Sequence, residues 1–149
     1  MNVLTILKQH SRPVCTVTSN QSIADAIKLM TARKADALIV TDDDHPAGIF
    51  TARDIFRYYL HAEKLPPAET KLSDIITGSL MTVAPADDIT TAINMMMTSD
   101  IRHLPVMEND KIIRVLTLKD VLGCQIDLLT DEIHALQDYI DDLHEAAQD

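Results

Sequence analysis

The sequence predicts an α+β fold made of two copies of one β-α-β-β-α unit, followed by a long C-terminal helix. Three observations support this prediction. A shift of 66 residues aligns positions 14–56 with 80–122 without a gap, and 11 of the 43 aligned pairs are identical. Within each copy a helical pattern is followed by two apolar runs that predict a hairpin. Beyond residue 120 apolar residues recur at alternating steps of four and three, which indicates one continuous amphipathic helix.

The elements of the first copy follow from local patterns. Apolar residues at positions 23, 26, 27 and 30 have helical spacing, and Ser22 stands one residue ahead as an N-cap. Acidic, turn-forming residues separate the two apolar runs that come next. The expected elements are a strand at Cys15–Thr18, a helix from Ile23, strands at Ala37–Val40 and Ala47–Thr51, and a helix from about residue 52.

The second copy repeats this order, with Asp88 as the N-cap. Its expected elements are a strand at Met81–Ala84, a helix from Ile89, strands at Leu104–Met107 and Ile112–Thr117, and a helix from about residue 118. The Pro-containing segment 65–70 separates the copies. We therefore divide the chain into a first repeat at 1–66, a second repeat at 67–124 and an amphipathic helix at 125–149.

The C-terminal helix carries a heptad pattern. With Ile126 as position a, isoleucine occupies every a position and leucine every d position through Leu143, a combination that favours a parallel two-stranded coiled coil. The flanking e and g positions are mostly neutral, and the acids lie further out. About three heptads are marginal alone, so the alternative that the helix folds back on its own or a neighbouring body stays open.

Composition and charge exclude several function classes. The chain has 149 residues, 13 Lys and Arg against 23 Asp and Glu, and a net charge of −10, which argues against binding the nucleic-acid backbone. Without Trp, and with three Tyr and two Phe, it also has few side chains on which bases could stack. Residues 130–149 hold seven acids and no Lys or Arg, so the other 129 residues have a net charge of only −3.

The sequence lacks the patterns that mark metal sites, signal peptides and membrane spans. Cys15 and Cys124 stand alone, without a CxxC pair, and the six histidines show no metal-ligand spacing, so we expect no metal and no disulfide. The N-terminus lacks the apolar stretch of a signal peptide, and no run approaches the ~20 apolar residues of a membrane span. A cytoplasmic protein without membrane contact is the expectation.

The repeat unit resembles the CBS domain, named for cystathionine β-synthase. That family is marked by a Gly-apolar-x-Thr/Ser-x-x-Asp segment after the third strand, and Gly48-Ile-Phe-Thr-Ala-Arg-Asp54 matches it in full. The second copy has Arg114-Val-Leu-Thr-Leu-Lys-Asp120, which keeps Thr117 and Asp120 but replaces the glycine. Segments 81–85 and 101–106 also resemble sequences typical of the family. The resemblance implies two repeats packed as a pseudo-twofold pair, and association into a homodimer.

The resemblance also implies an adenosine ligand: AMP, ADP, ATP or S-adenosylmethionine. Aspartate can accept hydrogen bonds from ribose hydroxyls, while a threonine hydroxyl, helix N-terminal N–H groups and basic side chains favour phosphate. The alternative is that Thr and Asp only cap the following helix. The candidate nucleotide-binding residues are Thr16, Gly48, Thr51, Arg53, Asp54, Thr82, Arg102, His103, Thr117, Lys119 and Asp120.

The two candidate sites differ in charge. The first has Gly48 but also Asp36, which would repel a phosphate; the second has Arg102, His103 and Lys119, but Arg114 replaces the glycine. On charge we expect the second site to be the better one.

Three functions compete. The leading hypothesis is a regulatory module in which a nucleotide changes the relative angle of the repeats and an unknown effector protein responds. The alternative is a structural dimerisation or adaptor protein without a ligand. An enzyme is disfavoured, because no catalytic constellation can be argued from the spacing.

Overall fold

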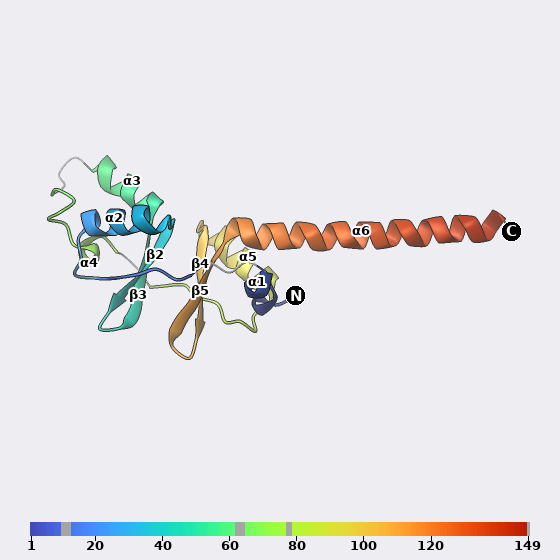
Figure 1. The fold of residues 1–149 in the computed structure, drawn as a ribbon, viewed down its shortest axis with the longest axis horizontal. Coiled ribbons are helices and arrows are strands. Elements are labelled where there is room, and N and C mark those ends of the chain that lie inside the picture. Colours follow the sequence, from blue (N-terminus) through green and yellow to red (C-terminus); the bar gives the residue numbers. More distant parts are fainter. Residues whose placement is uncertain (10–12, 62–64, 77–78, 149) are drawn as a thin grey trace.

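The computed structural model describes residues 1–9, 13–61, 65–76 and 79–148. Two small sheets with their helices lie side by side, and one long helix projects from the second repeat (Figure 1). The first part contains α1 (Val3–Gln9), β1 (Thr16–Thr18), α2 (Ile23–Arg33), β2 (Ala37–Asp42), β3 (His45–Thr51) and α3 (Ala52–Leu60). The second contains α4 (Leu72–Ile75), α5 (Ile89–Thr98), β4 (His103–Glu108), β5 (Lys111–Thr117) and α6 (Leu118–Gln148). The predicted α+β fold is confirmed.

Both predicted N-caps are confirmed. Ser22 Oγ accepts a hydrogen bond from the Asp25 N–H at 3.1 Å, and the Asp25 carboxylate accepts from the Ser22 N–H at 3.3 Å, which completes a capping box. At the start of α5 the Asp88 carboxylate accepts from the Thr90 N–H at 2.7 Å. This bond favours the charged form and holds the pKa of Asp88 below its usual value. Both amphipathic helices therefore begin where the sequence predicts.

The first sheet has the order β1-β2-β3, with β1 parallel to β2 and β2 antiparallel to β3. The second consists of the antiparallel pair β4-β5. The strand predicted at Met81–Ala84 is wrong in extent, because only Val83 pairs there, by a single parallel bridge to Val106. The bridge is made by the Val83 N–H donating to Pro105 O at 3.0 Å and the Met107 N–H donating to Val83 O at 2.8 Å.

Two prolines explain why this strand is short. In the first sheet the ladder continues through the Ile39 N–H to Cys15 O at 2.8 Å and the Ser19 N–H to Thr41 O at 2.9 Å. The residues 66 positions after these two donors are Pro105 and Pro85, and proline has no N–H to donate. Both continuing bonds are therefore impossible in the second repeat.

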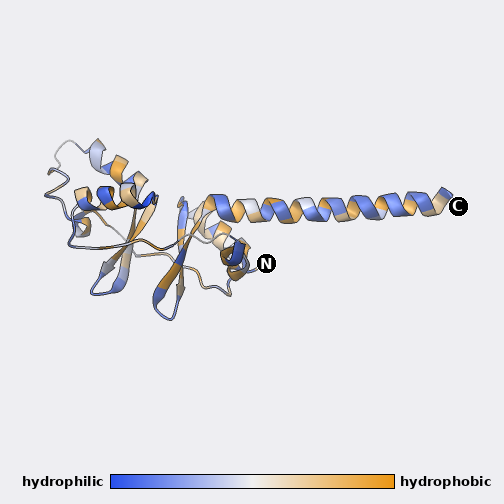
Figure 2. Cartoon of the chain, in the orientation of Figure 1, coloured by the Kyte–Doolittle hydropathy of each residue, from blue (hydrophilic) through white to orange (hydrophobic). Residues whose placement is uncertain are grey.

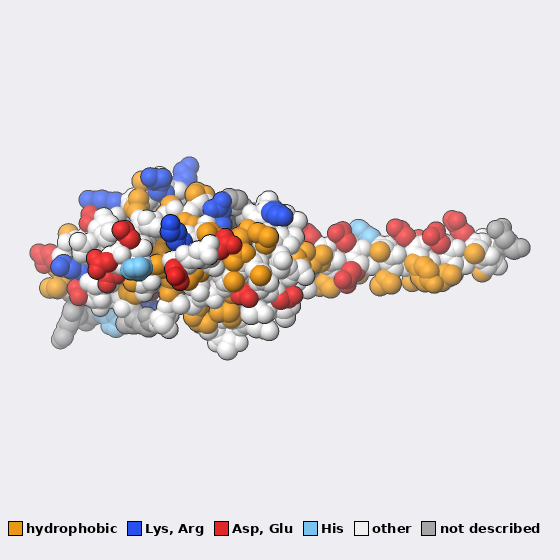
Figure 3. Space-filling view, turned by 90° about the horizontal axis from the view of Figure 1, so that it is seen from below, with side chains coloured by type: hydrophobic (Ala, Val, Ile, Leu, Met, Phe, Trp, Pro, Cys, Tyr) orange, Lys and Arg blue, Asp and Glu red, His pale blue; other side chains and the backbone are white. Residues whose placement is uncertain are grey.

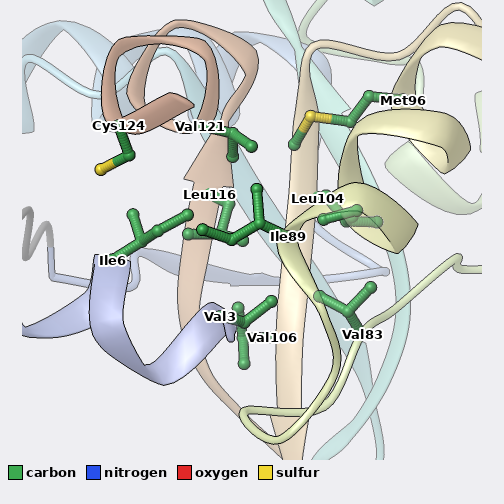
Figure 4. Close-up of a cluster of buried hydrophobic side chains, with 11 residues drawn as sticks. Val3, Ile6, Val83, Ile89, Met96, Leu104, Val106, Leu116, Val121 and Cys124 are labelled. Atoms are coloured by element: carbon green, nitrogen blue, oxygen red, sulfur yellow. The ribbon is translucent and has the colours of Figure 1, made fainter. Parts of the chain in front are cut away.

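Each repeat has its own hydrophobic core, but the short leading helices are exchanged. The second core, drawn in Figure 4, includes Val3 and Ile6 of α1, from the start of the first repeat, together with residues of α5, β4, β5 and α6. The first core includes Leu72 of α4, from the start of the second repeat. Ile6 and Leu72 are 66 positions apart and both fully buried. The exchange is thus the same in both directions.

Backbone hydrogen bonds tie each exchanged segment to its host. The Val3 N–H donates to Asp87 O at 2.8 Å, just before α5. Likewise the Leu72 N–H donates to Gln21 O at 2.9 Å, just before α2. The sequence-based division at 66/67 stays a prediction, and each core includes a segment from the other side of it.

The two thiols differ in accessibility. Cys124 is 2% exposed within the second core, and its Sγ lies 3.5 Å from the Gln9 side-chain oxygen, whereas Cys15 is half-buried. Burial raises the pKa of the Cys124 thiol, which lowers its reactive thiolate fraction at neutral pH.

We expect a thiol reagent at pH 7 to modify the half-buried Cys15 faster than the buried Cys124. Mass spectrometry of the labelled native protein measures both rates, with labelling in denaturant as the control. Equal rates in the native protein would contradict the buried position of Cys124.

Helix α6 is continuous from Leu118 to Gln148, so the second helix of the repeat and the C-terminal helix are one element. Only Val121 and Cys124 are buried, and residues 129–148 are all exposed. The helix does not fold back on its own body; Figure 1 shows it pointing away. Among the described residues no helix is long and apolar enough to cross a membrane.

Candidate functional site

A pocket of about 670 Å³ lies between the repeats, within the range usual for small-molecule sites. Its walls come from the end of β3 and start of α3, the segment after α4, and the segment joining α5 to β4. The lining residues are Asp36, Gly48, Ile49, Thr51, Ala52, Arg53, Asp54, Phe56, Arg57, Ile75, Ile76, Ser79, Leu80, Met81, Ser99, Asp100, Ile101, Arg102, His103 and Pro105. Both repeats therefore contribute to one cavity.

Gly48 allows a close approach at this wall. It is buried in β3, and a Cβ placed on it would lie 2.5 Å from Ile76 Cγ2, closer than van der Waals contact permits. In the second repeat Arg114 occupies the equivalent register position, since it pairs with Val106 as Gly48 pairs with Val40. The Arg114 guanidinium Nη1 donates to Ile113 O at 2.7 Å.

We expect Gly48→Ala to cost about 1–3 kcal/mol of unfolding free energy, because the β-branched Ile76 must move with its backbone. Denaturant unfolding measures this cost. Gly123→Ala is the matched control, because a Cβ there meets no atom within 4 Å and alanine favours its helix. A loss no greater than that of the control would contradict the close packing.

Thr51 and Asp54 sit where β3 ends and α3 begins, at the pocket wall. The Asp54 carboxylate oxygen Oδ2 accepts from the Thr51 N–H at 2.8 Å and from its hydroxyl at 3.3 Å. In the second repeat the Asp120 N–H donates to Thr117 Oγ1 at 3.1 Å. Hydrogen bonds of the helix-capping kind are therefore present in both repeats, made by the Asp54 carboxylate in the first and by the Thr117 hydroxyl in the second. These bonds do not exclude a second role, since the other carboxylate oxygen, Asp54 Oδ1, lies 3.7 Å from Arg57 Nη1 and can accept further hydrogen bonds.

Arg53 connects the two repeats. Its Nη1 donates to the Asp100 main-chain oxygen at 2.7 Å and lies 3.3 Å from the Asp100 carboxylate. Arg53 lies in the first turn of α3 in the first repeat, and Asp100 lies between α5 and β4 of the second. The Arg53 guanidinium thus bridges the two repeats at the pocket and is already hydrogen-bonded to Asp100.

The charges along the pocket are mixed. Arg57 and the exposed Arg102 add to Arg53 and to the half-buried His103. The acids are Asp36, Asp54 and Asp100. The pocket therefore holds basic side chains from both repeats, such as Arg57 and Arg102, together with the Asp54 carboxylate. This combination suits a ligand that has an anionic group at one end and hydroxyl groups at the other.

The pocket collects six of the predicted site residues: Gly48, Thr51, Arg53, Asp54, Arg102 and His103. Thr16, Thr82, Thr117, Lys119 and Asp120 are not among its lining residues. The sequence analysis grouped Arg102 and His103 with Thr117 and Asp120; in the structure they line the pocket that contains Thr51 and Asp54. The repeats face each other, so the start of β4 lies opposite the start of α3.

The sequence analysis missed Arg57, Phe56, Ile76 and Asp100 as lining residues. The position of Arg57 could have been predicted from the sequence, because it follows Arg53 by four positions on one helix and so lies on the same face. The positions of Ile76 and Asp100 could not, because nothing local in the sequence shows which residues of one repeat contact the other. Among the described residues no cluster of three or more His, Cys, Asp or Glu could hold a metal ion.

Comparison with known families gives one match, the CBS domain, at residues 6–61 and again at 72–127. A curated relative is the mitochondrial CBS domain-containing protein CBSX3 of Arabidopsis thaliana, 30% identical over 128 residues. That alignment covers 83% of this chain but only 62% of the relative's length.

Two solved structures illustrate the shared fold. A protein with CBS domains from Burkholderia ambifaria superposes with a TM-score of 0.77 at 34% identity, covering 85% of this chain and 95% of that one. The CBS domain pair of protein MJ0100, crystallised with 5′-methylthioadenosine and S-adenosylmethionine, superposes with a TM-score of 0.70 at 22% identity, covering 83% and 94%.

Proposed function

The chain belongs to the CBS domain family and carries two CBS domains, and from this premise we propose that it is a regulatory module whose inter-repeat pocket binds an adenosine ligand. The observation that carries the proposal is the pocket in which Thr51 and Asp54 of one repeat meet Arg102 and His103 of the other. AMP, ADP, ATP and S-adenosylmethionine are the ligand candidates. The MJ0100 pair supports this choice, because the same fold holds adenosine compounds there.

Each wall of the pocket suits one part of the ligand. The Asp54 carboxylate, part-buried and held by Thr51, would accept hydrogen bonds from the ribose hydroxyls. Ile75, Ile76 and Met81 offer apolar surface for the adenine. Arg57 and Arg102 are placed to bind phosphate oxygens or a carboxylate from two sides.

Arg53 provides a route from binding to conformational change. A phosphate that takes hydrogen bonds from the Arg53 guanidinium competes with Asp100, the residue through which Arg53 holds the second repeat. Binding then loosens one tie between the repeats and shifts the population toward a different relative angle. We propose that the chain acts in this way as a homodimer, binding rather than converting its ligand, and that an effector protein responds.

The test is thermal and denaturant unfolding of the purified protein with each of the four ligands. A ligand present at 100 times its Kd is expected to add about 2.7 kcal/mol of stability. No shift with any adenosine compound would favour the adaptor alternative. Turnover of ATP by the purified protein would show an enzyme instead.

Two matched substitutions locate the site. Asp54→Ala and Asp120→Ala each remove an aspartate from the first turn of a helix. We expect Asp54→Ala to weaken binding at least tenfold and Asp120→Ala to leave it within about twofold. The reverse result would support the charge-based expectation that the site of Thr117 and Asp120 is the better one.

A further inference from the structure

Helix α6 presents an uncovered apolar stripe along its whole length. The stripe consists of Leu122, Ile126, Leu129, Ile133, Leu136, Ile140 and Leu143, whose exposed fractions lie between 39% and 63%. Figure 3 shows apolar side chains along one edge of the projecting helix and acidic ones along the other, and Figure 2 shows apolar and polar residues alternating along it. So many large apolar side chains on a free helix indicate a missing partner.

We propose that α6 pairs with α6 of a second copy as a parallel, in-register, two-stranded coiled coil. The proposal rests on the homodimer of the proposed function and names the surface and orientation that make it. Isoleucine at every a position and leucine at every d position is the pattern that selects two parallel strands over three or four. A strict repeat of seven over the stripe is the seam of such a pair.

The charges allow a second copy despite the acidity of the helix. Asp127, Asp131, Asp138, Asp141, Asp142 and Glu145 all fall at positions b, c or f, away from the seam. In a parallel pair each g residue faces the e residue five positions later in the partner. These pairs are Gln125–Thr130, Glu132–Gln137 and Tyr139–His144, so no like charges face each other across the seam.

The stripe and the buried contacts of α6 lie on different sides of the helix. Val121 and Cys124 anchor α6 to its own core, and Leu128 is half-buried. At 100° per residue, the stripe lies about 110° around the helix from the direction of these three residues. The side that would contact a second helix is therefore not the side that α6 already uses to contact its own body.

Light scattering after size-exclusion chromatography tests the pairing. The wild-type chain is expected to have the mass of two copies, and the double variant Ile133→Glu/Leu136→Glu the mass of one, because two buried carboxylates per helix disrupt the seam. Ala135→Glu, at the outer position c, is the matched control and is expected to stay at two copies. The thermal shift with nucleotide, repeated on the double variant, reports that the body is still folded.

The outcomes separate the coiled coil from the proposed function. A double variant that keeps two copies would overturn the coiled coil and leave a homodimer formed elsewhere, such as through the exposed Phe56 and Leu60 of α3. A wild-type chain of one copy would overturn both coiled coil and homodimer, and three or four copies would overturn the two-stranded assignment. Ligand binding is scored independently in every case by the thermal shift.

Orientation has its own readout. Leu143→Cys at position d is expected to form an intermolecular disulfide under mild oxidation, because a parallel in-register pair brings the two copies of this position together. Glu145→Cys at the outer position f, and the wild type with its native Cys15 and Cys124, are the controls and should remain uncross-linked. Failure of Leu143→Cys to cross-link in a protein of two copies would overturn the parallel orientation.

Discussion

Replacing Ile6 with alanine is expected to lower the free energy of unfolding by about 2–5 kcal/mol, a large part of the stability of a domain this size. Ile6 is fully buried among residues of the second repeat, and the truncation leaves a cavity there. The damage should therefore appear in the second repeat, although Ile6 lies at the start of the first. Denaturant unfolding measures the loss, and amide hydrogen exchange in β4 and β5 shows where it acts.

A neighbouring residue provides the control. Leu4 lies on the same short helix and is 42% exposed, so Leu4→Ala removes the same kind of side chain with much less burial. The Cys124 thiol is a second probe, because it belongs to the core that Ile6 joins, and its labelling should accelerate in Ile6→Ala. Faster exchange confined to β2 and β3 in this variant would contradict the exchanged position of α1.

Replacing Leu72 with alanine is expected to have the mirror-image effect. Leu72 is fully buried in the first core, so its truncation should also cost about 2–5 kcal/mol and raise hydrogen exchange in β2 and β3. Leu65→Ala is the control, because that side chain is 61% exposed. A variant that loosened β4 and β5 while sparing the first sheet would show that α4 supports its own repeat.

The exchange of α1 and α4 bears on the proposed regulatory function. Each repeat is held partly by a short helix from the start of the other repeat, and the Arg53–Asp100 contact adds a third connection. A change in the angle between the repeats must therefore act on several ties together. This coupling suits a module in which a ligand between the repeats is read out at α6, which leaves the second core at Cys124.

Most local structure could be predicted from the sequence. Helix starts at Ser22 and Asp88, the two hairpins and the long helix depend on residues close together in the chain, so periodicity and cap residues identify them. The strand predicted at Met81–Ala84 is too long, because apolar character alone does not show which backbone N–H groups can pair. The ladder donors missing at Pro85 and Pro105 are visible in the sequence once the two repeats are compared bond by bond.

The candidate site could be predicted only in part. The motif from Gly48 to Asp54 is local, and the structure places all of its predicted members in the pocket. The partners Arg102 and His103 were grouped by repeat number, whereas the pocket forms across the repeats. Asp100 and Ile76 were missed for the same reason, since their role depends on which surfaces meet.

The repeat, the order of its elements and the heptad stripe of α6 follow from the sequence alone, because they depend on spacings and residue types along short stretches of chain. The exchange of α1 and α4, and the pocket with walls from both repeats, depend on how the whole chain packs. The physical reason is the symmetry of the repeat. Ile6 and Leu72 are equivalent positions with apolar side chains that suit either core, so only the packing of the whole chain distinguishes the two arrangements.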